Sequence, residues 1–80
     1  MRYESKYIVK LHTEASPQAP ETGRTRPGDI VTRIVTAVDA QGVTWACVRT
    51  KSGDTHWCVW EKSGVRMFKA LGDTTEGRDG

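Results

Sequence analysis

The fold is decided by residues 44–60, TWACVRTKSGDTHWCVW, which hold all three tryptophans and both cysteines of this 80-residue chain. Two runs rich in Trp, Val and Thr flank a Ser-Gly-Asp cluster. Such runs are typical of β-strands, and Gly accepts the positive φ that a tight hairpin turn requires. The stretch therefore predicts a β-hairpin with strands over residues 44–50 and 55–60.

The two cysteines lie one in each predicted strand. With a two-residue loop at Ser52-Gly53, Cys47 falls opposite Cys58 and Trp45 falls opposite Trp60. Directly opposed residues of an antiparallel pair have Cα atoms about 5.5 Å apart, within reach of a disulfide. A loop one residue longer breaks this register. We expect two reduced, half-buried thiols that fill core space, because free Cys behaves as a small hydrophobe, with the disulfide as the alternative.

Further strand patterns lie on both sides of the hairpin. Residues 6–13 alternate so that Tyr7, Val9 and Leu11 share the expected inner face. Residues 30–38 are rich in β-branched side chains, but apolar residues occur on both faces. That pattern predicts either two partly covered faces or a β-bulge that shifts the register midway. A short last strand is expected over 65–71.

Two segments lack the apolar side chains of a strand. Residues 14–29 hold all three prolines and no large apolar residue, which predicts a long surface loop of a kind that often carries function. Residues 72–80 contain three glycines and no apolar residue, which predicts a disordered tail. We therefore expect one domain over residues 1–71, followed by that tail.

Size and strand count together predict the fold class. A chain of 80 residues forms one domain at most, and such a chain buries on the order of 60% of its unfolded surface. Five short strands in so short a chain predict an all-β fold, a small and partly open barrel. No apolar run approaches the roughly 20 residues of a membrane span, and the first residues show a strand pattern rather than an apolar leader.

Three segments follow one another in a characteristic order. Residues 27–31, PGDIV, lead from the loop into a strand; residues 42–48, GVTWACV, contain Gly-x-x-Trp-x-x-Val; and residues 52–58, SGDTHWC, combine a Gly turn with a Trp. In these segments the chain resembles the bacterial SH3-like (SH3b) family, small β-barrels appended to cell-wall hydrolases and surface proteins. The resemblance covers about residues 7–71, with His56 where the family usually has Gly.

The resemblance implies a five-stranded SH3-like barrel that is not an enzyme and that binds an extended ligand in a shallow groove. The ligand would be a cell-wall peptide or glycan, or a protein segment. By position, the ligand-binding residues are Tyr7, Trp45 and Trp57, with the loop over Glu14–Arg26. Trp suits this role because it presents a large rigid apolar face and one N–H donor. We expect at least one tryptophan to be half exposed, because three exceed what one sheet face buries.

The sequence lacks the residue patterns typical of catalytic and metal-binding sites. Cys47 or Cys58 as a nucleophile would need a histidine and an orienting acid, and no third group is evident. His12 and His56 complete a possible four-ligand zinc set with these cysteines, but the Cys-x-x-Cys spacing typical of zinc sites is absent. Paired carboxylates and phosphate loops are absent as well. We therefore expect no enzymatic activity, no cofactor and no metal.

Two other kinds of partner stay open as alternatives. Residues 1–69 carry eleven Lys and Arg against seven Asp and Glu, a net charge of +4 that permits an acidic partner. Basic residues near Trp would bind single-stranded nucleic acid by stacking and phosphate contact, which we rank below peptide or glycan binding. An intracellular adaptor or regulator would instead pair with a protein along a sheet edge. The sequence does not identify the compartment.

Overall fold

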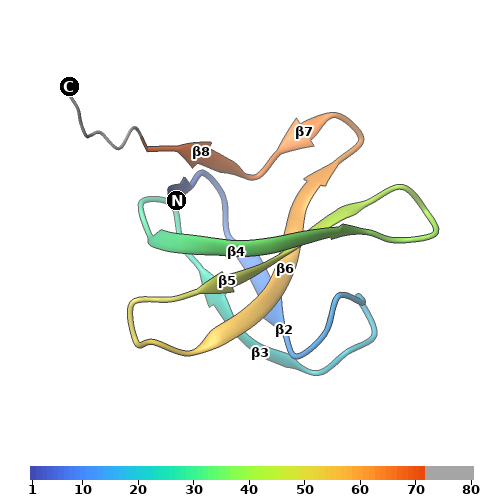
Figure 1. The fold of residues 1–80 in the computed structure, drawn as a ribbon, viewed down its shortest axis with the longest axis horizontal. Coiled ribbons are helices and arrows are strands. Elements are labelled where there is room, and N and C mark those ends of the chain that lie inside the picture. Colours follow the sequence, from blue (N-terminus) through green and yellow to red (C-terminus); the bar gives the residue numbers. More distant parts are fainter. Residues whose placement is uncertain (72–80) are drawn as a thin grey trace.

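The computed structural model describes residues 1–71, which fold into eight β-strands and contain no helix (Figure 1). The strands are β1 (Arg2–Ser5), β2 (Val9–His12), β3 (Glu21–Thr25), β4 (Ile30–Val38), β5 (Thr44–Arg49), β6 (Thr55–Lys62), β7 (Val65–Arg66) and β8 (Phe68–Ala70). This described part accordingly holds no helix long and apolar enough to cross a membrane. The predicted all-β class is confirmed.

All eight strands belong to one antiparallel sheet. Its order is β3-β2-β6-β5-β4-β1-β8, and β7 lies beside β6. The last segment therefore contacts two distant strands, with β7 on β6 and β8 on β1. Met67 lies at the bend between them: its N–H donates to the carbonyl of Trp60 at 3.0 Å, and its carbonyl accepts the N–H of Lys6 at 3.0 Å.

The core lies on one face of this sheet and is rich in aromatic rings. Its nine members come from six strands, so the sheet curls around a single cluster: Tyr3, Val9, Leu11, Val31, Ala46, Val48, Cys58, Trp60 and Phe68. Trp60 stacks on Phe68 with ring centroids 4.5 Å apart, and Tyr3 meets Trp60 edge-on at 4.6 Å. The Arg33 guanidinium covers Tyr3 and Trp60 at 5.0 and 5.6 Å, a cation–π arrangement.

The loop of the tryptophan hairpin has three residues, Lys51–Gly53, and not the predicted two. The N–H of Gly53 donates to the carbonyl of Thr50 at 2.9 Å, and the N–H of Thr50 donates to the carbonyl of Asp54 at 3.0 Å. Gly53 has a φ of 94°, as expected for the last residue of a type I turn that closes with a glycine bulge. This is the register that a loop one residue longer gives, so Cys47 does not lie opposite Cys58, and the two thiols are free as expected.

In the observed register the cysteines point to opposite faces. Cys47 lies opposite Trp57, and Cys58 lies opposite Ala46 in the core. Both are free thiols, Cys47 half-buried and Cys58 fully buried. Burial, together with the nearby Cys47, raises the pKa of Cys58 to about 12. Cys58 is therefore a neutral thiol at physiological pH and fills core space rather than acting as a nucleophile.

The count of eight strands replaces the predicted five. The N-terminal residues form a separate strand, β1, and β3 lies inside the segment predicted to be all loop. The last predicted strand is divided at Met67 into β7 and β8. Within β4 the register shifts between Arg33 and Val35, which confirms the predicted bulge. The tail predicted over 72–80 lies outside the described residues.

Candidate functional site

Trp45 is enclosed on the outer face of β5, opposite to the core. Only 2% of its surface is exposed, and its indole Nε1–H donates to Asp39 Oδ2 at 3.0 Å. Asp39 Oδ1 accepts the N–H groups of Gln41 and Val43 at 2.9 and 3.0 Å. The hydrogen bond from Trp45 and, to a smaller extent, the backbone hydrogen bonds hold the pKa of Asp39 below its usual value. This indole is thus fixed within the β4–β5 hairpin and offers no open face to a ligand.

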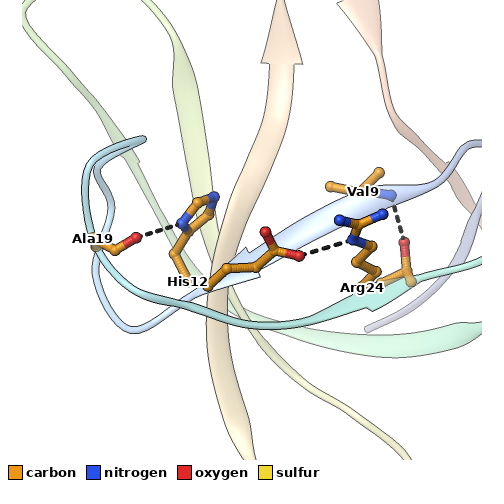
Figure 2. Close-up of polar contacts among 6 residues, drawn as sticks. Val9, His12, Ala19 and Arg24 are labelled. Carbon is orange, nitrogen blue, oxygen red and sulfur yellow. Dashed lines mark hydrogen bonds and ion pairs between the residues drawn. The ribbon is translucent and has the colours of Figure 1, made fainter.

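The loop over residues 14–20 folds across this outer face and is anchored at His12. That ring is 7% exposed, and its Nδ1 lies 3.0 Å from the carbonyl oxygen of Ala19 (Figure 2). Because a carbonyl only accepts, Nδ1 carries the hydrogen. Farther along β3, Arg24 pairs with Glu21 at 2.8 Å, which lowers the pKa of Glu21 (Figure 2). The loop is therefore held against the sheet rather than standing free of it.

A groove of about 590 Å³ runs between this loop and the sheet; we call it the loop groove. Pro17 and Ala19 line it from the loop, and Ile8, Trp45 and Val59 are among the residues lining it from the sheet. The segment predicted to be functional does line a groove. Most of the apolar surface there comes from aliphatic side chains, because Trp45 is almost fully covered.

The three predicted ligand-binding aromatic residues do not share one groove. Tyr7 is 46% exposed and lies between β1 and β2. Trp57 is half-buried and lies opposite His12, at the other end of β2. Five residues of extended chain span about 16 Å, so Tyr7 is remote from Trp57. Of the three, only Trp45 lines the loop groove.

A different site lies along β4, where the strand extends beyond its neighbour. β1 pairs only with the first half of β4, from Glu4 opposite Ile30 to Arg2 opposite Thr32. One further bond, from the N–H of Arg33 to the carbonyl of Met1 at 3.0 Å, ends this contact. Past that point no residue within 1–71 pairs with the side of Ile34–Val38 that faces away from β5. We call this side the β4 free edge (Figure 1).

The hairpin fixes which backbone groups point outward at this edge. The N–H of Asp39 donates to the carbonyl of Val43 at 3.0 Å, so the backbone of Asp39 faces β5. Alternate residues of an antiparallel strand direct their N–H and C=O groups to the same side. Val35 and Ala37 therefore bond to β5, whereas Thr36 and Val38 direct their N–H and C=O groups away from the sheet.

Apolar side chains accompany these unpaired groups. Ile34, Val35 and Val38 are 48%, 49% and 68% exposed. Val35 and Ala37 lie opposite Cys47 and Trp45 and share one face of the strand; Val38 lies on the other face, and Ile34 lies within the bulge. The only signal in the sequence was the presence of apolar residues on both faces of 30–38. That pattern fits burial on both sides or exposure, and in the described residues Ile34–Val38 is exposed.

The other strands at the ends of the sheet are protected from edge pairing. β3 carries Glu21 and Arg24, and β8 has only three residues, one of which is Lys69. Charges and short length are the usual means by which proteins prevent edge-to-edge association. Ile34–Val38 contains no charge, proline or glycine. Within residues 1–71, the β4 free edge therefore lacks the charges and short length that protect β3 and β8 at the two ends of the sheet.

The described residues do not bring the side chains of a metal site together. Within 1–71, no group of three or more His, Cys, Asp or Glu side chains is placed to hold a metal ion. The four possible zinc ligands are divided: His56 bonds to Thr22 Oγ1 at 2.8 Å, and Cys58 lies in the core. Comparison of the chain with protein-family models, curated proteins and solved structures finds no significant match.

Proposed function

We propose that this protein is a non-enzymatic binding module that holds an extended segment of a partner protein by adding it as a strand to the β4 free edge. The observation that carries the proposal is the contrast between edges. β3 and β8 bear charged side chains, whereas Ile34–Val38 combines outward backbone groups with exposed apolar side chains. Strand addition uses such backbone groups for affinity and the alternating side chains for specificity.

The backbone groups and side chains of the β4 free edge indicate what kind of peptide segment would bind there. An added antiparallel strand would exchange backbone hydrogen bonds with Thr36 and Val38. Its side chains would alternate between Thr36 and Val38 on one face and Val35 and Ala37 on the other, which favours a segment rich in β-branched residues. Because the contact is one short strand, we expect weak, transient binding of the kind small interfaces give.

The SH3-like form of the barrel belongs to the same proposal. It is supported by the segment Val65–Ala70, which contacts β6 through β7 and β1 through β8. With that segment, the neighbours β6, β5, β4 and β1 complete a ring around the core. A cell-wall peptide or glycan, the ligand that the resemblance implies, would then occupy the loop groove instead of the β4 free edge.

The test is an NMR titration of ¹⁵N-labelled protein with two probes. One is a synthetic nine-residue peptide of alternating valine and threonine with a lysine at each end, and the other is a muropeptide. We expect the strand peptide to shift the amide signals of Thr36 and Val38, and the muropeptide to leave them unchanged. The same peptide N-methylated at alternate residues cannot donate the ladder hydrogen bonds and should produce no shifts.

Two variants complete the design. Val38→Lys places a charge on the β4 free edge and should abolish the shifts. Ile8→Lys changes another exposed side chain, 65% exposed and outside the edge, and should preserve them. The proposal is overturned if the muropeptide shifts Ala19 and the Trp45 indole while the strand peptide shifts nothing. It is also overturned if the edge signals change only with protein concentration, since the occupant would then be a second copy of the chain.

A further inference from the structure

A second groove lies between β3, β4 and the tip of the β5–β6 hairpin, with a volume of about 760 Å³; we call it the basic groove. Four cationic side chains line it, Arg2, Arg24, Arg49 and Lys51, against one carboxylate, Asp29. The lining thus carries a net charge of +3, whereas the whole chain carries +2. Four of the twelve Lys and Arg of the chain line this groove, with one acid among its lining residues.

Two of the arginines form a row across neighbouring strands. Arg2 lies opposite Thr32 on β4, and Thr32 lies opposite Arg49 on β5. Directly opposed residues share a face of the sheet, and neighbouring strands lie about 4.8 Å apart, so the two arginine Cα atoms are about 10 Å apart. Both arginines are exposed. The Thr32 hydroxyl between them adds a neutral hydrogen-bond donor.

Most of this charge is not compensated by nearby acids. Arg24 pairs with Glu21 at 2.8 Å, and the Asp29 carboxylate accepts the N–H of Arg26 at 2.8 Å. The other three cations, Arg2, Arg49 and Lys51, make no ion pair with any residue of the described chain. Three cations that share a concave surface raise the local concentration of an anionic ligand.

We propose that the basic groove binds the phosphate backbone of single-stranded nucleic acid through charge and without base stacking. Arginine suits this role because its planar guanidinium donates two hydrogen bonds to one phosphate. A row about 10 Å long exceeds a single phosphate, which favours an extended backbone over a single anion. No Trp, Tyr or Phe lines the groove, so the stacking typical of single-strand binders is absent there.

The proposal is tested by the salt dependence of binding to a fluorescent 20-nucleotide oligothymidylate, followed by anisotropy. Three phosphate contacts predict a slope of log K against log salt of about −2, since each contact contributes about −0.7. Raising the salt concentration from 50 to 200 mM should therefore weaken binding about 20-fold. Arg49→Ala removes one contact, and the slope should fall to about −1.4.

A matched variant distinguishes binding in the basic groove from general attraction to the positive charge of the protein. Lys69→Ala removes an exposed lysine of β8 that does not line the groove, and we expect it to leave the slope at the wild-type value. Circular dichroism of both variants checks that they are folded. The proposal is overturned if Lys69→Ala weakens binding as much as Arg49→Ala, or if the oligonucleotide shows no salt-dependent binding. Displacement by inorganic phosphate at constant ionic strength also overturns it, because the site would then hold a single anion.

Discussion

Replacing Thr25 with valine will break a chain of buried hydrogen bonds that joins β1, β2 and β3. Ser5 and Thr25 are 1% and 2% exposed, and their hydroxyl oxygens lie 2.7 Å apart. The Ser5 hydroxyl donates to the carbonyl of Tyr7 at 2.7 Å, so its single hydrogen is used and Thr25 donates to Ser5. The N–H of Val9 donates in turn to Thr25 Oγ1 at 3.3 Å.

The cost follows from the groups that lose a partner. Thr25→Val keeps the shape of the side chain but removes the hydroxyl that donates to Ser5 Oγ and accepts the N–H of Val9, so buried polar groups lose a partner in the interior. Each unsatisfied buried group costs about 1–3 kcal/mol. We expect a loss of about 2 kcal/mol in the free energy of unfolding, which lowers the Tm of a domain this small by about 8–16 °C. Urea denaturation followed by tryptophan fluorescence measures the loss.

Ser5→Ala is the control, because it tests which hydroxyl donates in the hydrogen bond between Ser5 and Thr25. Without Ser5, the Thr25 hydroxyl turns to the carbonyl of Tyr7, from which it is already only 3.4 Å away. We therefore expect Ser5→Ala to cost less than Thr25→Val, and the double variant to cost less than the sum of both. A loss below about 0.5 kcal/mol for Thr25→Val, or strictly additive losses, would refute the reasoning.

Three further predictions concern stability, pH and thiol chemistry. Trp60→Ala should lower the free energy of unfolding by about 3–5 kcal/mol, and the half-buried Trp57→Ala by clearly less; equal losses in urea denaturation would contradict the assigned core. The folded pKa of Asp39 lies below its unfolded value, so its contribution to stability is full above about pH 4 and is lost as the pH falls further. Thermal unfolding from pH 6 to pH 2.5 should show a larger loss in the wild type than in Asp39→Asn, in which the loss from Glu21 remains. Ellman's reagent at pH 8 should modify Cys47 before Cys58, because the reaction of the buried Cys58 requires unfolding. Equal rates of modification would contradict the burial of Cys58 in the core.

The tryptophan hairpin could be predicted from sequence, but its register could not. Alternation of Trp, Val and Thr around Gly53 indicates two strands, and both formed. A glycine with positive φ fits either the second residue of a two-residue loop or the third residue of a three-residue loop. Local sequence does not distinguish these loops, and one residue of difference moves every side chain to the opposite face. The position of Cys47 and Cys58 on opposite faces of the hairpin follows from that single choice.

Features that depend on distant contacts were also missed. β3 has no large apolar residue, and it forms because it pairs with β2 and buries the Thr25 hydroxyl. Trp45 lies on the face away from the core, where His12 of β2 and the loop over 14–20 lie beside it, and both are distant in sequence. Within residues 1–71, β1 pairs with β4 only from Ile30 to Thr32, and no pattern within residues 30–38 encodes this distant contact.

The most direct test of the central claim is amide hydrogen exchange along β4, measured by NMR with and without the strand peptide. In the free protein, Thr36 and Val38 should exchange nearly as fast as an unfolded chain, while Val35 and Ala37 are protected by β5. Bound peptide should slow amide exchange at Thr36 and Val38 and leave exchange at Val35 and Ala37 unchanged. Protection of Thr36 and Val38 in the free protein, or unchanged exchange when the peptide is bound, would contradict the account.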